Sequence, residues 1–316
     1  VIGAGAAGCV VANRLSKQKQ FQVYCLEAGG NDTNPFIKIP AGFSKTVYNP
    51  KLNWPYFTSP SKNTGNRSIK FPRGKVVGGS SSINGHLYVR GQAADYDGWA
   101  QLGCTGWDWD GVLPYFKKAE TRINGDKKIR GTSGPLIISD LTELHPLTKI
   151  FIDTVDKIGI KKNSDYNSGN QEGTATYQNM IKNNVRWSAA DAYLRPILHQ
   201  RNFKLIKNSL VEKLILKNKK ITGVIFKNNN SLRKINVRKE VILSAGSINS
   251  PQILQLSGIG DKFYLEKLGI KCLIHSPEVG KNLKDHYAIR IAMRVKNIST
   301  YNEKSRGFHL LKEVFK

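Results

Sequence analysis

Acidic residues are scarce in this 316-residue chain: 23 Asp and Glu stand against 49 Lys and Arg, which gives a formal net charge of +26. Such a charge can indicate a nucleic-acid binder, but base stacking requires aromatic side chains interleaved with the cations. Here the lysine pairs are dispersed and flanked by Asn and Gly. We therefore expect a lysine-rich surface and no nucleic-acid partner, and we keep weak attraction to an anionic membrane surface open.

Long apolar runs and clustered cysteines are also missing. No stretch approaches the roughly 20 apolar residues that a transmembrane helix needs. The four cysteines form no CxxC pair and share no metal-like spacing, so we expect no metal site and a reducing compartment. These features predict a cytoplasmic protein, with peripheral association at the inner membrane as an alternative, and the length suffices for one large or two medium domains.

A glycine-rich turn stands at the very start of the chain, with the pattern Gly3-x-Gly5-x-x-Gly8. The next residues, CVVANRLSKQ, carry helical spacing, and FQVYCLEAGG supplies an apolar strand that ends at Glu27. This order is typical of a dinucleotide site, in which glycines permit the turn and a close approach of pyrophosphate to a helix N-terminus. Glu27 would accept hydrogen bonds from the ribose hydroxyls, and its negative charge would repel the 2′-phosphate of NADP. Ala6, Ala7 and Ala28 are also predicted to contact the dinucleotide.

A second glycine-rich loop, PRGKVVGGSSSINGHLYVRG, covers residues 72–91. Its five glycines disfavour a regular helix or strand, while its serines and Asn84 offer short polar groups for a cofactor or for the loop's own backbone. A nicotinamide site does not need such a loop, whereas FAD extends well beyond the first turn. A self-stabilised surface loop remains the alternative at this point.

The second loop resembles the first signature of the glucose–methanol–choline oxidoreductase family, close to its choline and alcohol dehydrogenase members, over residues 74–97. The stretch GSINSPQILQLSGIG resembles the second signature. RWSAADAYLRP, GWDWDGVLPYFKKAE and VGKNLKDH agree as well, and the likeness runs in the family's order to about residue 290.

The resemblance implies an α/β fold: a Rossmann-like FAD-binding domain with a β-ribbon insertion, plus the beginning of an α+β substrate domain. The FAD-binding domain would comprise residues 1–143 and 186–292. The substrate domain would comprise 144–185 and 293–316, so the two domains would be interleaved.

The resemblance also implies which residues bind FAD. The backbone of the second loop would line the pyrophosphate and flavin, and Val211 would contact adenine through its main chain. The small residues of the turn at Ala245 predict a helix N-terminus that faces the cofactor, with a scaffold turn that touches no ligand as the alternative. Some choline-oxidising members attach the flavin through a His where this chain has Ile83, so we expect non-covalent FAD. The predicted residues of the second loop and the later turn are Val76, Gly78, Gly79, Ser80, Asn84, Gly85, His86, Leu87, Ala245 and Gly246.

Secondary structure is predicted for the rest of the chain. VILSAG reads as a strand that leads into a helix capped by Asn249 or Ser250, with Pro251 in its first turn. The preceding stretch from Phe203 alternates apolar and polar residues, which predicts an antiparallel ribbon. We also expect an amphipathic helix at residues 147–158, a loop or lid at 163–184, and an amphipathic helix in the final FHLLKEVFK.

For activity, the resemblance implies an FAD-dependent oxidoreductase that acts on the CH–OH group of a choline-like or other small primary alcohol. Hydride would pass to flavin N5 and then to a quinone-type acceptor or oxygen. The family's base is a His near the carboxyl end, paired with a second His or Asn. The six His of this chain form no such pair, so we assign no catalytic residue and expect an amino-terminal part of a longer enzyme. A non-catalytic FAD-binding module and another flavin or NAD Rossmann oxidoreductase remain alternatives.

Overall fold

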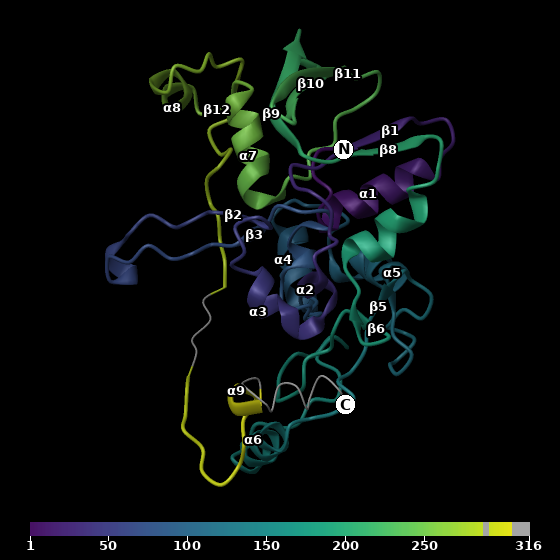
Figure 1. The fold of residues 1–316 in the computed structure, drawn as a ribbon, viewed down its shortest axis with the longest axis vertical. Coiled ribbons are helices and arrows are strands. Elements are labelled where there is room, and N and C mark those ends of the chain that lie inside the picture. Colours follow the sequence, from purple (N-terminus) through teal and green to yellow (C-terminus); the bar gives the residue numbers. More distant parts are fainter. Residues whose placement is uncertain (287–290, 305–316) are drawn as a thin grey trace. The chain divides into compact units, whose positions relative to one another are not determined.

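The computed structural model describes residues 1–286 and 291–304 (Figure 1). The chain divides into two compact units, Val1–Lys281 and Asn282–Lys316, and helix α9 (Tyr301–Lys304) belongs to the second. The amphipathic helix expected at residues 308–316 lies outside the described residues. The interleaved domain boundaries expected from the sequence stay a prediction.

A small parallel sheet brings together four segments of the sequence. Strand β1 (Val23–Leu26) pairs in parallel with β8 (Phe203–Ile206), and the two lie side by side in Figure 1. Ile2 forms parallel bridges to Leu26 and to Leu243. The chain start therefore lies between β1 and the segment before the second signature, an arrangement typical of a Rossmann-like fold.

Helix α1 (Ala6–Ser16) packs on this sheet through small side chains. Its buried residues include Gly8, Cys9 and Ala12, and the last two lie in one core cluster with residues of β1 and β8. The same cluster contains η4 (Ala190–Leu194), a single π-helical turn, and η5 (Arg195–Ile197). The short side chains let the helix approach the strands closely, so its N-terminus is held at the edge of the sheet.

The expected antiparallel ribbon is present as three strands, β9 (Ser209–Lys217), β10 (Lys220–Asn228) and β11 (Ser231–Asn236). The first part of the stretch predicted as ribbon, however, is β8 of the parallel sheet, so that part of the prediction was wrong. Asn208 adopts a φ of 52° between β8 and β9, and this left-handed residue redirects the chain from one sheet to the other.

The second signature differs from the sequence prediction at its start. Helix α7 (Gly246–Leu256) begins directly after Ala245, so the predicted caps and Pro251 lie inside the helix. Gly246 has a φ of 84°, which permits the abrupt turn. The expected strand before it pairs only through the bridge between Leu243 and Ile2 among the residues described.

The remaining elements are short. The helices are α2 (Pro35–Lys38), η1 (Pro40–Gly42), α3 (Phe43–Thr46), η2 (Lys62–Thr64), η3 (Gly79–Ser82), α4 (Ala93–Gln101), α5 (Trp109–Ala119), α6 (Pro146–Lys157) and α8 (Lys262–Lys267). The strands are β2 (Asn53–Trp54), β3 (Arg73–Gly74), β4 (Glu120–Thr121), β5 (Leu136–Ile137), β6 (Ile181–Lys182), β7 (Val185–Arg186), β12 (Ile259–Gly260) and β13 (Ile274–His275). Helix α6 confirms the predicted amphipathic helix, and residues 163–180 form the expected loop, but β6 lies within the predicted stretch of 163–184, so its last part was wrong.

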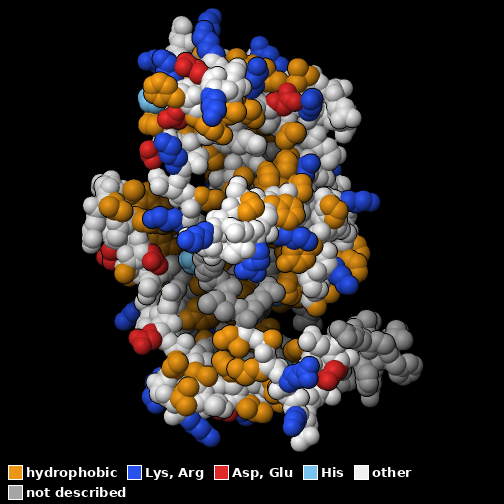
Figure 2. Space-filling view, turned by 90° about the vertical axis from the view of Figure 1, so that its left-hand side faces the viewer, with side chains coloured by type: hydrophobic (Ala, Val, Ile, Leu, Met, Phe, Trp, Pro, Cys, Tyr) orange, Lys and Arg blue, Asp and Glu red, His pale blue; other side chains and the backbone are white. Residues whose placement is uncertain are grey.

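Lys and Arg side chains are spread over the face shown in Figure 2 and do not gather in one continuous track there. Within the described ranges, every helix is too short or too polar to cross a membrane.

Candidate dinucleotide-binding site

A cavity of about 610 Å³ lies where the first glycine turn, the second glycine loop and the start of α7 meet. This volume falls within the range of small-molecule sites in proteins. The structure brings eleven of the sequence-predicted cofactor residues to its wall: Gly3, Gly5, Ala6, Ala7, Glu27, Ala28, Gly79, Ser80, Val211, Ala245 and Gly246.

The two glycine turns touch each other at this cavity. A methyl group built on Gly79 would stand 2.7 Å from the Cα atom of Gly5, and Gly79 has a φ of 56°. The neighbouring Gly78 donates its backbone N–H to the carbonyl oxygen of Ala4 at 2.8 Å. The first turn is tight as well, because a methyl group on Gly8 would lie 1.8 Å from the carbonyl oxygen of Gly3. Glycine is thus required where the two backbones approach.

Glu27 lies just beyond β1 and is buried at the wall of the cavity. Its Oε2 accepts the backbone N–H of Ala4 at 2.9 Å, and its Oε1 accepts that of Gly29 at 2.8 Å. Burial raises the pKa of this carboxyl, and the two backbone hydrogen bonds oppose that rise. Each carboxylate oxygen can accept a further hydrogen bond, so the side chain is suited to a hydroxyl pair such as that of a ribose.

Two helices point their N-termini at the cavity. Helices α1 and α7 have eleven residues each, no acidic residue in the first turn, and no side-chain hydrogen bond to the cap. The first residues of both helices line the cavity. Free N–H groups and the helix dipoles therefore favour a negatively charged group, such as a pyrophosphate, between them.

Sequence reasoning missed the contribution of the β2–β3 hairpin. Trp54 and Tyr56 stack with ring centroids 5.9 Å apart, and both line the cavity. The Tyr56 hydroxyl hydrogen-bonds Oδ1 of Asn249 in α7, which joins the hairpin to the second signature. The aromatic pair in NWPYF was the available signal, but only the pairing of β2 with β3 shows where it lies. Further lining residues not predicted are Arg73, Gly74, Ser209, Ser244, Ser247 and Gln252.

Seven predicted residues do not line the cavity: Gly8, Val76, Gly78, Asn84, Gly85, His86 and Leu87. Oδ1 of Asn84 accepts Nη1 of Arg186 at 3.1 Å. Nδ1 of His86 lies 3.0 Å from Oδ1 of Asn179, and burial, followed by the charge of Arg186, lowers the pKa of the imidazole. Their role towards a cofactor stays a prediction.

Ile83, which replaces the flavin-attaching His of some relatives, is buried at 2% exposure. It lies in an apolar cluster with Ile37, Leu52 and Val76. The Ile83 side chain therefore packs against hydrocarbon, and it carries no nucleophilic atom that could bond to a flavin.

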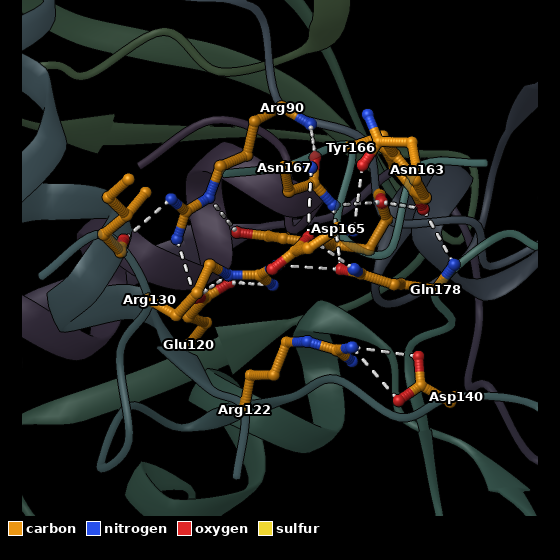
Figure 3. A network of polar contacts seen from close by, with 12 residues as sticks. Arg90, Glu120, Arg122, Arg130, Asp140, Asn163, Asp165, Tyr166, Asn167 and Gln178 are labelled. Carbon is orange, nitrogen blue, oxygen red and sulfur yellow. Dashed lines mark hydrogen bonds and ion pairs between the residues drawn. The ribbon is translucent and has the colours of Figure 1, made fainter. Parts of the chain in front are cut away.

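A buried ionic network joins the loop at 163–180 to Glu120, to Arg130 and, through Arg90, to the end of the second glycine loop (Figure 3). Arg130 forms a bidentate ion pair with Glu120, with hydrogen bonds of 2.7 and 3.0 Å, and its Nη1 donates to Oδ1 of Asp165 at 2.7 Å. Although burial disfavours a charged Glu120, the arginines hold its pKa below the usual range. Tyr88 then donates its backbone N–H to the carbonyl oxygen of Gln178 at 2.8 Å. The network thereby fixes the backbone next to His86.

The residues on the cavity wall also bear on catalysis. Among the described residues that line it, no histidine is present, so the structure brings no imidazole base to this cavity.

Comparison with known proteins gives the family. A family model described as GMC oxidoreductase matches residues 1–288. The chain belongs to the GMC oxidoreductase family. Oxygen-dependent choline dehydrogenase of Vibrio vulnificus is 43% identical over 310 residues, which are 98% of this chain and 55% of that protein. The corresponding protein of Brucella anthropi is 43% identical over 92% of this chain and 53% of its own length.

Solved structures agree with the GMC fold. Pyridoxine 4-oxidase from Mesorbium loti has a TM-score of 0.85 and 31% identity, over 88% of this chain and 55% of that one. Formate oxidase has a TM-score of 0.83 and 28% identity, over 90% and 51%. The predicted Rossmann-like fold of the GMC oxidoreductases is therefore confirmed, and the chain spans about half the length of the relatives it matches.

Proposed function

We propose that this chain binds one FAD molecule non-covalently in the cavity between its two glycine turns. The contact between Gly5 and Gly79 carries the proposal, because it joins the dinucleotide turn to a second glycine loop at a single cavity. A dinucleotide that stops at the first turn would leave the second loop without a ligand. The position of Ile83 in an apolar cluster supports the non-covalent state.

The residues present fit the parts of FAD. Glu27 would accept the ribose hydroxyls, and the backbone at Val211 would contact adenine. The N-termini of α1 and α7 would hold the pyrophosphate. Gly79 and Ser80 would lie along FAD between its pyrophosphate and its flavin ring, and Asn84 and His86 follow in the same loop.

For the whole protein, the proposed activity is oxidation of the CH–OH group of a small primary alcohol, choline-like in the first instance. The relatives named oxygen-dependent choline dehydrogenase, at 43% identity, support this choice. Bound FAD would supply the hydride acceptor. The residues of this chain would bind the cofactor and orient it, while the proton acceptor for the alcohol is not assigned among them.

Oxygen or a quinone-type compound is the proposed electron acceptor. A quinone would place the reaction at a membrane surface, where the net charge of +26 would favour weak association with anionic lipid.

The activity is tested by mixing the FAD-loaded chain with choline under anaerobic conditions and following the visible absorbance of the flavin. Because no proton acceptor for the alcohol is assigned among the residues of this chain, we expect bleaching about 10²–10⁴-fold slower than by a choline dehydrogenase. Choline deuterated at the carbinol carbon should bleach the flavin more slowly still. Reduction that requires a nicotinamide would contradict the proposal.

A non-catalytic FAD-binding module is the second candidate, because the residues described supply a cofactor cavity while no catalytic base is assigned among them. It predicts that the chain binds FAD with the same affinity, and that choline leaves the flavin spectrum unchanged over any period of incubation.

A further inference from the structure

A second cavity, of about 380 Å³, shares no lining residue with the first among the residues described. It lies beside the β6–β7 hairpin and η4. Most of its wall is charged: the lining residues are Lys38, Lys182, Asn183, Val185, Arg186, Trp187, Asp191 and Arg195.

Arg186 is the most unusual member of this wall, because its side chain has no exposed surface. Its Nε donates to the carbonyl oxygen of Ile37 at 2.9 Å, and its Nη1 donates to that of Ser81 at 3.2 Å and to Oδ1 of Asn84 at 3.1 Å. All three acceptors are neutral. Nη2 is buried and has no hydrogen-bond partner among the described residues. A buried guanidinium bonded only to neutral groups carries a large desolvation cost.

Asp191, the carboxylate whose charge acts on Arg186, is already committed to other donors. Oδ1 of Asp191 accepts Nζ of Lys38 at 2.6 Å and Nε of Arg195 at 2.7 Å. Its Oδ2 accepts the backbone N–H and the hydroxyl of Ser188, at 3.0 and 2.7 Å. Four donors occupy the four acceptor positions of the carboxylate, which leaves none for Arg186.

The other cations of the wall divide into two groups. Lys38 and Arg195 are neutralised by Asp191 together with Asp32, whose Oδ2 accepts Nη2 of Arg195 at 2.6 Å. Lys182 is exposed, and its Nζ lies 4.4 Å from the ring centroid of Trp187, with no carboxylate paired to it in the part of the chain that the structure describes. Arg186 and Lys182 therefore leave two positive charges without an acidic partner among the described residues.

We propose that the second cavity binds a small dianionic oxyanion, a phosphate or a dicarboxylate, which Nζ of Lys182 contacts and whose charge neutralises that of the buried Arg186 in the wall. Two unneutralised cations match a dianion better than a monoanion. Nη2 of Arg186 has almost no accessible surface, so the guanidinium attracts the ligand through its charge, while the exposed and flexible lysine supplies the direct contact. The site does not depend on the FAD proposal, because it involves a different cavity.

The test is calorimetric titration of the chain with inorganic phosphate and with succinate, at constant ionic strength adjusted with chloride. The two compounds distinguish a phosphate ligand from a dicarboxylate ligand, and acetate serves as the monoanion. We expect saturable binding of at least one dianion and much weaker binding of acetate.

Lys182→Gln removes one of the two charges from an exposed position and should leave the fold intact. It should weaken dianion binding about tenfold, the usual effect of losing a charged hydrogen bond. Lys239→Gln removes an exposed lysine outside the cavity and should leave binding unchanged. Arg186→Lys keeps the charge but alters the bonds to Ile37, Ser81 and Asn84, so Lys182→Gln is the decisive variant.

Three results would each overturn the site: no saturable heat with either dianion, equal binding by Lys182→Gln and the unchanged chain, or equal weakening by Lys182→Gln and Lys239→Gln. The last would show that the net charge of the surface attracts anions without a defined cavity.

Discussion

Gly79 of the second loop lies against Gly5 of the first turn, with room for hydrogen and none for a methyl group. This contact links two glycine-rich sequences that are far apart in the chain. It places both at one cavity, together with the N-terminus of α1. The close approach is therefore where the proposed cofactor site is most sensitive to substitution.

Gly79→Ala should damage both the fold and FAD binding. The new methyl group would stand 2.7 Å from the Cα of Gly5, and the φ of 56° is unfavourable for alanine. We expect a loss of about 1–3 kcal/mol in the free energy of unfolding and at least tenfold weaker FAD binding, measured by urea unfolding and by quenching of flavin fluorescence.

Gly98→Ala is the matched control for this substitution. Gly98 lies in α4, and a methyl group added there would have no described atom within 4 Å, so alanine should be neutral or stabilise the helix by about 0.5–1 kcal/mol. If both alanine variants bind FAD as the unchanged chain does, the two loops do not share a ligand.

Glu27→Gln should weaken FAD binding by about tenfold, because a charged acceptor for the ribose hydroxyls becomes a neutral amide. The amide also places an NH₂ group where the carboxylate accepts the N–H of Ala4 or Gly29. Quenching of flavin fluorescence measures the affinity for FAD, and displacement of FAD measures the affinity for ADP. Both affinities should fall by about the same factor. Glu172→Gln, at an exposed position in the 163–180 loop, is the control. An unchanged affinity for ADP would remove Glu27 from the adenosine site.

The state of the flavin can be tested by acid precipitation. Ile83 is buried in an apolar cluster and has no atom that could form a bond to the flavin. We expect all of the yellow colour in the supernatant after precipitation. Colour that remains in the protein pellet would show a covalent attachment at another residue.

The ionic network of Figure 3 predicts a response to acid. The pKa values of Glu120 and Asp165 are both held low in the folded chain. Their contribution to stability is therefore complete above the unfolded-state pKa values of about 4, and it is lost as the pH falls through the folded values. Urea unfolding between neutral and acidic pH measures this loss.

Glu120→Gln should lower the free energy of unfolding at neutral pH by about 3–5 kcal/mol, since it leaves buried arginines without their carboxylate. The variant should also lose less stability on acidification. Glu143→Gln, which changes an exposed carboxyl, should behave as the unchanged chain does. If both variants lose the same free energy of unfolding on acidification, carboxyls other than Glu120 determine the response to acid.

The local parts of the site could be predicted from sequence, and the long-range parts could not. The turn from Gly3 to Gly8 and the acid at Glu27 have fixed spacing, because one strand–helix–strand unit determines it. The contribution of Trp54 and Tyr56 depends on the pairing of β2 with β3, which no local pattern specifies. Likewise, the capping residues at 249–251 predict a later start for α7 than the structure has, because the glycine at 246 makes the turn and the helix begins there.

Titration of the purified chain with FAD, followed by gel filtration and absorbance, measures whether the two glycine turns hold one cofactor. We expect one FAD retained per chain and competition by ADP for the adenosine half. A chain that emerges colourless after incubation with FAD would contradict this expectation.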